Sequence, residues 1–265
     1  MRFPIVIAAI LLDAAASFAA DVVPLEHAHA HNDYEHERPL LDALDNGFCS
    51  VEADIWLVAG ELLVAHDRDK ATPGNTLQKL YLDPLLERAR ANGGRVYKDG
   101  PEVLLLVDIK SGAEETYTAL RGALERYAEM LTSFTNDGTI TKRAVRVIVS
   151  GNRPRVMMEA EAVHLAAYDG RPEDLGGGAS SAFIPLVSQS WTPLFRWRGR
   201  ETPMPDDERA KLESMVKRAH AEGRKVRFWA IPHDEALWDA LYGAGVDLIN
   251  ADNLPMLRDF LLRKR

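Results

Sequence analysis

The amino-acid sequence predicts an α/β fold and, within that class, a single-domain (β/α)8 or TIM barrel. Eight short apolar segments occur along the 265-residue chain, and helical patterns fall between them. Alternation of this kind is typical of a parallel sheet, and eight repeats favour closure into a barrel. An open doubly wound sheet is the competing arrangement, but no G-x-G-x-x-G phosphate-binding motif follows the first predicted strand.

The predicted strands are apolar runs of the type that is buried on both faces, such as V-L-L-L-V at 103–107. We expect the eight barrel strands at residues 22–29, 48–56, 102–109, 144–150, 162–168, 182–189, 225–231 and 246–251. A further short strand at 61–65 is expected to pair beside the second one.

Helical patterns between these strands begin and end at recognisable signals. Pro39 begins the first pattern and Gly47 ends it, and Asp83-Pro84 begins the second. Apolar residues recur at helical spacing over 117–131, and again from about 206 to 223.

The composition is that of a folded globular protein, with 46% hydrophobic and 27% charged residues. The formal net charge of −8 argues against nucleic acid as the main partner. A single cysteine, Cys49, excludes an internal disulfide and a multi-cysteine metal site.

The amino terminus has the pattern of a secretory signal peptide. An apolar stretch at 3–12 precedes small residues and an A-x-A-like cleavage site at 17–19. This stretch is shorter than the roughly 20 residues that span a bilayer. We expect a signal peptide over 1–19, a mature domain over 20–265, and a secreted or periplasmic location. The alternative is a plain extension, because Asp13 places a charge at the end of the apolar stretch.

Polar side chains gather where the predicted strands end, which is where barrels carry their active sites. The first strand ends in His29 and His31, which share one face because side chains alternate along a strand. The second strand carries Glu52 and Asp54, and the third ends in Asp108.

Three carboxylates at one barrel mouth repel one another and are costly to bury. A hard divalent cation with oxygen ligands removes this cost, and Mg²⁺ or Ca²⁺ are the natural choices. An ion-pair network with Lys110, two residues after Asp108, is the alternative.

The ordered set of motifs resembles the phosphatidylinositol-specific phospholipase C/glycerophosphodiester phosphodiesterase superfamily. The stretch from His29 to Asp67 contains H-N-D-Y, R-P-L-L-D-A-L, S-V-E-A-D-I-W and L-L-V-A-H-D, and is most similar to the subgroup of "altered inheritance of mitochondria protein 6" proteins. D-I-K at 108–110 and the strand with Trp229 also resemble sphingomyelinase D. The H-R-G and P-E-N-T signatures of glycerophosphodiesterases are absent, which leaves the headgroup open.

This resemblance implies a Mg²⁺- or Ca²⁺-dependent phosphoric diester hydrolase of lipid metabolism, acting on a glycerophosphodiester- or phospholipid-like substrate. The attacking hydroxyl is either water or a hydroxyl of the substrate, and the second case gives a cyclic phosphate. By the same resemblance, the metal ligands are Glu52, Asp54 and Asp108, the catalytic residues are His31, His66 and Lys110 with His29 as the alternative first histidine, and the substrate-binding residues are Asn32, Trp229, Asn250 and Asp252.

Two other functions fit part of the pattern. His29-x-His31 also resembles the histidine–metal sites of amidohydrolases and related phosphoesterases, which favour Zn²⁺. Those sites need further histidines at later strand ends, and the fifth and sixth predicted strands end without any. The other alternative is a non-catalytic barrel that binds a phospho-ligand.

The expected partner is a small-molecule or lipid phosphodiester. No later segment is apolar enough to cross a membrane. The loop over 190–205 places Trp191, Phe195 and Trp197 among arginines. It is either a lid that grips an amphiphilic phosphate or contacts a membrane surface, or it is a loop that folds onto the barrel. The sequence leaves the oligomeric state open.

Overall fold

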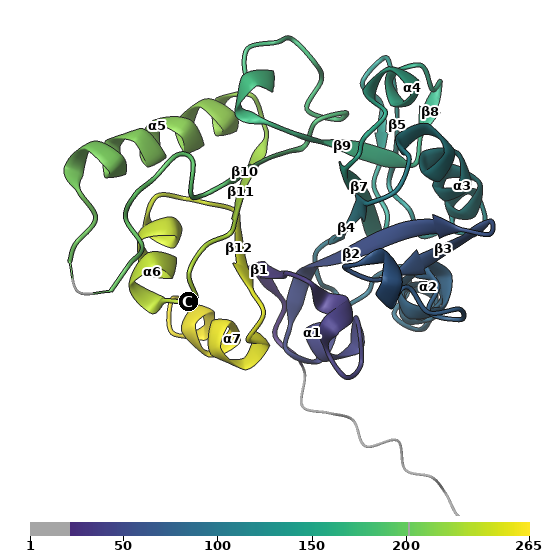
Figure 1. Ribbon diagram of the computed structural model, residues 1–265, viewed down its shortest axis with the longest axis horizontal. Coiled ribbons are helices and arrows are strands. Elements are labelled where there is room, and N and C mark those ends of the chain that lie inside the picture. The colour runs from purple at the N-terminus through teal and green to yellow at the C-terminus, as the bar shows by residue number, and fades with distance from the viewer. Residues whose placement is uncertain (1–21, 201) are drawn as a thin grey trace, which may run out of the picture.

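The computed structural model describes residues 22–200 and 202–265, so the signal peptide predicted over 1–19 lies outside the described residues. Eight parallel strands form a closed barrel, which confirms the predicted fold class (Figure 1). The ring closes because β1 pairs with both β12 and β2. The barrel strands are β1 (Leu25–Ala30), β2 (Phe48–Val58), β4 (Val103–Ile109), β7 (Val145–Gly151), β9 (Ala166–Gly170), β10 (Leu186–Ser190), β11 (Lys225–Trp229) and β12 (Leu248–Ala251).

Helices surround this ring and cover its outer face (Figure 1). They are α1 (Leu41–Asp45), α2 (Asp83–Ala91), α3 (Ala113–Glu125), α4 (Arg155–Glu159), α5 (Asp206–Ala221), α6 (Glu235–Gly243) and α7 (Leu254–Leu262). Short turns of helix, η1 (Asp33–Glu35), η2 (Arg68–Lys70) and η3 (Gln78–Leu82), lie in the connections. Between β9 and β10 the chain contains η4 (Pro172–Asp174) and no α-helix. Pro172 and the three consecutive glycines at 176–178 explain the missing helix, since proline and glycine both disfavour a helix interior.

Four strands lie outside the ring. β3 (Glu61–Val64) pairs antiparallel with β2, as predicted for 61–65. β5 (Ser133–Thr135), β6 (Ile140–Thr141) and β8 (Val163–His164) form a separate small sheet. The strand predicted at 162–168 is therefore wrong in its first part, because 163–164 pair antiparallel with β5 and only the residues from 166 onwards join the barrel.

The register of the sheet aligns the polar strand ends at one level of the barrel. Asp54 on β2 lies opposite Asp108 on β4, and Asp108 lies opposite Ser150 on β7. Because side chains alternate along a strand, Val51, Ala53 and Ile55 point to the opposite side of β2 from Glu52 and Asp54. These apolar side chains are fully buried, so packing determines which face of β2 points inward.

In the loop predicted over 190–205, the described aromatic side chains pack onto the barrel. Trp191, Phe195 and Trp197 are all buried. The Trp191 ring stacks on Phe195 with ring centroids 4.1 Å apart, and Phe228 of β11 packs edge-on against both. None of the helices in the described residues has the length and hydropathy of a membrane span.

Candidate active site

One cavity of about 240 Å³ opens at the carboxyl ends of the barrel strands. Its lining combines the predicted metal ligands, both predicted proton-transfer histidines, five further polar or cationic residues and one tryptophan. The lining residues are His31, Asn32, Glu52, Asp54, His66, Asp108, Lys110, Ser150, Arg171, Arg227 and Trp229.

The predicted metal ligands form a compact acidic cluster on β2 and β4. Ligand oxygens of Glu52, Asp54 and Asp108 all lie within 4.8 Å of one another. Within residues 22–200 and 202–265 this is the cluster with metal-binding geometry, and it contains no histidine. The Lys110 Nζ atom lies 3.1 Å from an oxygen of Asp54 and 3.1 Å from one of Asp108. The ion pair predicted as the alternative to a metal is therefore present.

The protein's own cations do not fully compensate the cluster. Burial, with repulsion from Glu52, raises the pKa of Asp54 to about 6 despite the Lys110 ammonium. Burial also raises the pKa of Asp108. The buried Asp54 Oδ1 atom has no hydrogen-bond partner. A divalent cation with oxygen ligands fits these residues, because it would neutralise the carboxylates and coordinate the orphaned oxygen.

Glu52 differs from its two neighbours because it has a dedicated counter-charge. The Arg227 Nη2 atom donates to Glu52 Oε2 over 3.0 Å, and both side chains are buried. Burial alone would raise the pKa of Glu52, but Arg227, His29 and His31 outweigh it and hold this pKa well below its usual range. Glu52 therefore stays ionised and available as a ligand.

The structure distinguishes between the two candidate first histidines. His29 is completely buried, and its Nδ1 atom lies 2.7 Å from the Ser50 hydroxyl. Burial lowers the pKa of His29 to about 4, so its imidazole is neutral at physiological pH. His31 lines the cavity, and its Nδ1–H donates to Asp252 Oδ1 over 2.8 Å. The imidazole that reaches the cavity is that of His31.

Two predicted substrate-binding residues, Asn250 and Asp252, are not among the residues that line this cavity. Asp252 holds His31 through one oxygen, and His233 Nε2 lies 3.2 Å from the other. Asn250 is buried, and its Oδ1 accepts a hydrogen bond from Arg227 Nε over 3.0 Å. These two side chains position neighbouring groups, whereas Asn32 and Trp229 line the cavity as predicted.

His66 follows β3 and lies beside Tyr34, a residue that the sequence did not single out. The His66 Nδ1 atom lies 3.2 Å from Asp54 Oδ2 and 3.1 Å from the Tyr34 hydroxyl. Tyr34 also lies within hydrogen-bond distance of Asp54, at 2.7 Å, and of Asn32, at 2.8 Å. Tyr34 thereby connects the loop after β1 to the acidic cluster. Its signal was the tyrosine of the H-N-D-Y motif.

A second set of missed residues comes from β9, β10 and β11. The signal for Arg227 was a charge inside an otherwise apolar strand, where an inward position needs a buried partner. Asp169 is fully buried and accepts hydrogen bonds from Ser150, at 2.7 Å, and Ser188, at 2.5 Å. It also accepts one from Arg171 Nη1 at 2.7 Å.

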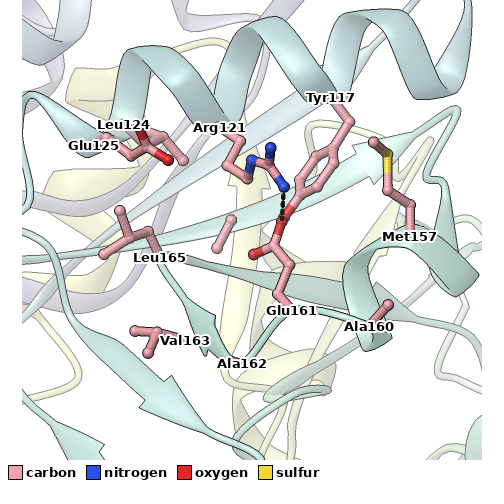
Figure 2. A pocket seen from close by; sticks show the side chains of 11 residues that line it. Tyr117, Arg121, Leu124, Glu125, Met157, Ala160, Glu161, Ala162, Val163 and Leu165 are labelled. Atoms are coloured by element: carbon pink, nitrogen blue, oxygen red, sulfur yellow. Dashed lines mark ion pairs between the residues drawn. The ribbon is translucent and has the colours of Figure 1, made fainter.

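A larger hollow of about 490 Å³ lies outside the barrel, between α3 and the segment that joins α4 to β9. Figure 2 shows that Arg121 and Glu161 face one another across it, with 3.8 Å between Nη1 and Oε1. Tyr117 of α3 and Met157 of α4 also line it. Its lining contains no histidine and only two carboxylates, Glu125 and Glu161, so the barrel mouth is the better candidate for catalysis.

Comparisons with known proteins identify relatives of this chain. The model of the AIM6-like phosphodiesterase domain matches residues 16–168. An "altered inheritance of mitochondria protein 6" from Eremothecium gossypii is 30% identical over 281 residues, which cover 93% of this chain and 72% of that protein. A homolog of this protein from Arthroderma benhamiae is 28% identical over 261 residues, covering 88% and 82% respectively.

Two solved structures share the fold at low sequence identity. A glycerophosphodiester phosphodiesterase from Parabacteroides distasonis has a TM-score of 0.51 and 16% identity, covering 90% of this chain and 98% of that one. A calcium-dependent phosphoinositol-specific phospholipase C from a Pseudomonas species has a TM-score of 0.55 and 12% identity, covering 88% and 91%.

Proposed function

Since this chain belongs to the AIM6-like phosphodiesterase domain family, we propose that it is a metal-dependent phosphoric diester hydrolase that uses His31 and His66 for proton transfer. One observation carries the proposal: a single cavity brings both imidazoles and Lys110 to a cluster of three carboxylates. The proposed substrate is a glycerophosphodiester- or phospholipid-like molecule.

The carboxylates of Glu52, Asp54 and Asp108 would hold Mg²⁺ or Ca²⁺. When bound, the cation would neutralise the nonbridging phosphate oxygens as charge develops on them. Lys110 would add a second positive group beside the phosphate.

The two imidazoles divide the proton transfers. One removes a proton from the attacking hydroxyl as its oxygen bonds to phosphorus, and the other donates a proton to the leaving oxygen as its bond to phosphorus breaks. Asp252 fixes Nδ1 of His31, which leaves Nε2 for the reaction. Attack by water yields a monoester and an alcohol, whereas attack by a substrate hydroxyl yields a cyclic phosphate.

The test uses the purified protein with bis(4-nitrophenyl) phosphate and, as the matched monoester, 4-nitrophenyl phosphate. We expect cleavage of the diester to stop with EDTA and to return with excess Mg²⁺ or Ca²⁺. Asp54→Asn should lose this rescue, since it removes a ligand charge from the cluster. Diester cleavage that survives EDTA would contradict the metal dependence. Cleavage of the monoester alone, restored by Zn²⁺, would contradict the assigned class.

A further inference from the structure

Arg171 is held at the cavity by one nitrogen of its guanidinium group. Nη1 donates to Asp169 Oδ2 at 2.7 Å, to the Gly170 carbonyl at 2.9 Å and to the Asp169 carbonyl at 3.3 Å. Asp169 is itself fixed by the hydroxyls of Ser150 and Ser188. The guanidinium lies over Trp229, 4.9 Å from the ring centroid. These contacts hold the group in one orientation before any ligand arrives.

The opposite edge of this guanidinium is uncommitted. No described residue accepts a hydrogen bond from Nε or Nη2 of Arg171, although the side chain lines the cavity. The other two cations of the cavity are already engaged. Arg227 uses the same edge for Asn250 and Glu52, and Lys110 lies between Asp54 and Asp108. Two parallel N–H groups match the two oxygens of a carboxylate or a phosphate.

Arg171 follows a strand on the other side of the ring from the strand that leads to His31. β9, which leads to Arg171, is separated from β1 by three strands in either direction around the ring. His31 follows β1, and the acidic cluster belongs to β2 and β4. Figure 1 shows β9 across the barrel from β1. A substituent of a diester held at the cluster would therefore reach Arg171 by extending across the cavity that both line.

We propose that Arg171 and Trp229 form a subsite for an anionic group, a carboxylate or a phosphate, on the headgroup of the substrate. The inference rests on the proposed diester hydrolysis and narrows its substrate class to diesters with a second negative charge. Trp229 supplies the apolar surface on which the arginine stacks, and Asp169 keeps the arginine from turning toward the acidic cluster.

Matched aryl diesters test this subsite. Carboxymethyl and carbamoylmethyl 4-nitrophenyl phosphate have the same shape and leaving group, and they differ only in the headgroup charge. A third diester, 2-(phosphonooxy)ethyl 4-nitrophenyl phosphate, separates phosphate from carboxylate as the preferred anion. We expect the wild-type protein to favour an anionic headgroup by about 10- to 100-fold in kcat/KM, mainly through KM.

Arg171→Gln should reduce this preference to near unity, and Arg171→Lys should retain part of it, since lysine keeps the charge without the paired donors. Arg218→Gln, which removes an exposed arginine of α5, is the matched control and should preserve the preference. The double variant Asp169→Asn, Arg171→Gln keeps the buried position neutral should the single variant fold poorly. An unchanged preference in both Arg171→Gln and the double variant overturns the subsite.

Failure of the proposed reaction would be distinguishable from failure of the subsite. If the wild-type protein cleaves none of the diesters, the same molecules serve as uncleaved ligands for calorimetry. Tighter binding of the carboxymethyl than of the carbamoylmethyl diester, lost in Arg171→Gln, supports the subsite. Equal binding of the two by the wild-type protein overturns it.

Discussion

The strands that come first along the chain bring carboxylates and imidazoles to the cavity, whereas β9 and β11 bring guanidinium and indole groups. We call β1 to β4 with their following loops the amino-terminal half, and β7 to β12 with theirs the carboxy-terminal half. Two polar groups of the amino-terminal half have partners in the other half, whereas His66 and Lys110 contact carboxylates of their own half. Glu52 is paired with Arg227, and His31 with Asp252.

In the proposed reaction, the reacting groups therefore lie in the amino-terminal half, and part of their support comes from the carboxy-terminal half. The acidic cluster alone would be a set of repelling buried charges. The carboxy-terminal half neutralises one of them through Arg227 and fixes the first imidazole through Asp252. Substitutions in the amino-terminal half should therefore affect chemistry most directly, and those in the carboxy-terminal half should act through stability, orientation or substrate choice.

The largest effect is expected from removing the imidazoles of the amino-terminal half. His31→Gln and His66→Gln should each lower kcat for an alkyl phosphodiester by about 10²- to 10⁴-fold, the usual contribution of general acid–base catalysis. The variant that lacks the general acid should recover most of its activity on a 4-nitrophenyl diester, whose leaving group needs no proton. Rates on the two substrates check this assignment.

His220→Gln provides the matched control for these variants. His220 is an exposed histidine of α5 that pairs with Asp247, outside the residues that line the cavity. It should leave both rates unchanged. Near-normal kcat in either His31→Gln or His66→Gln would remove that imidazole from the mechanism.

A double-mutant cycle across the two halves should give the next largest effect. Breaking a buried ion pair from one side typically costs about 3–5 kcal/mol, because the remaining charge is uncompensated. Arg227→Gln and Glu52→Gln should each cost an amount of this order, and the double variant should cost much less than their sum. Urea unfolding in EDTA measures all three. If the losses in unfolding free energy of the two single variants add up in the double variant, Arg227 and Glu52 do not stabilise one another.

The sequence was sufficient to predict the barrel and the gathering of carboxylates and histidines at its mouth, although it missed Tyr34. Acidic residues and histidines at the ends of apolar strands stand out, and their order along the chain matched a known superfamily. Strand periodicity could not distinguish His29 from His31, since both lie on one face. The register decides it: His29 lies opposite Asn250 in a buried layer, and His31 lies two residues nearer the mouth.

The carboxy-terminal half was harder to predict because its contacts join distant strands. Arg227 acts on Glu52 across 175 positions of the chain, and no local spacing records such a pair. The contacts of Asp252 with His31 and His233 likewise join separate segments of the chain, and nothing in the sequence indicated them. Arg171 lies in the connection without an α-helix, where helical and strand patterns give no guidance.

Asp252→Asn tests whether the carboxy-terminal half orients the first imidazole. Partners that orient a functional imidazole typically contribute about 10- to 100-fold, and a loss of that size in kcat/KM is expected. The hydrogen bond and charge of Asp252 raise the pKa of His233 above its ordinary value, so this pKa should fall in the variant. Activity assays and an NMR titration of His233 measure both effects.

The matched control for this variant lies at the other end of the barrel. Asp247 pairs with His220 at 2.8 Å, a similar arrangement of carboxylate and imidazole outside the cavity. Asp247→Asn should therefore leave kcat/KM close to wild type. Equal losses in the two variants would mean that Asp252 acts through general stability rather than on His31.

The smallest expected effect concerns a buried carboxyl group that lacks a counter-charge, Asp33 in the loop after β1. It accepts hydrogen bonds from the Leu40 amide at 2.5 Å and the Tyr81 hydroxyl at 2.9 Å, whereas Asp169 in the other half also has Arg171. Burial raises the pKa of Asp33 from 3.8 to about 7, despite these two bonds.

The folded state therefore binds this proton more tightly than the unfolded state, and the free energy of unfolding should fall as pH rises from about 4 to 7. The slope from one group is at most about 1.4 kcal/mol per pH unit. Asp33→Asn cannot titrate, so the difference in stability between wild type and variant should change with pH by up to this slope. Urea unfolding at pH 5, 6 and 7 measures this difference.

Asp169→Asn removes the counter-charge of Arg171 and should instead lower the free energy of unfolding already at pH 7. A difference between wild type and Asp33→Asn that stays constant over this range would mean that Asp33 is ionised in the folded protein throughout, and that its two hydrogen bonds compensate its burial as well as an arginine does for Asp169.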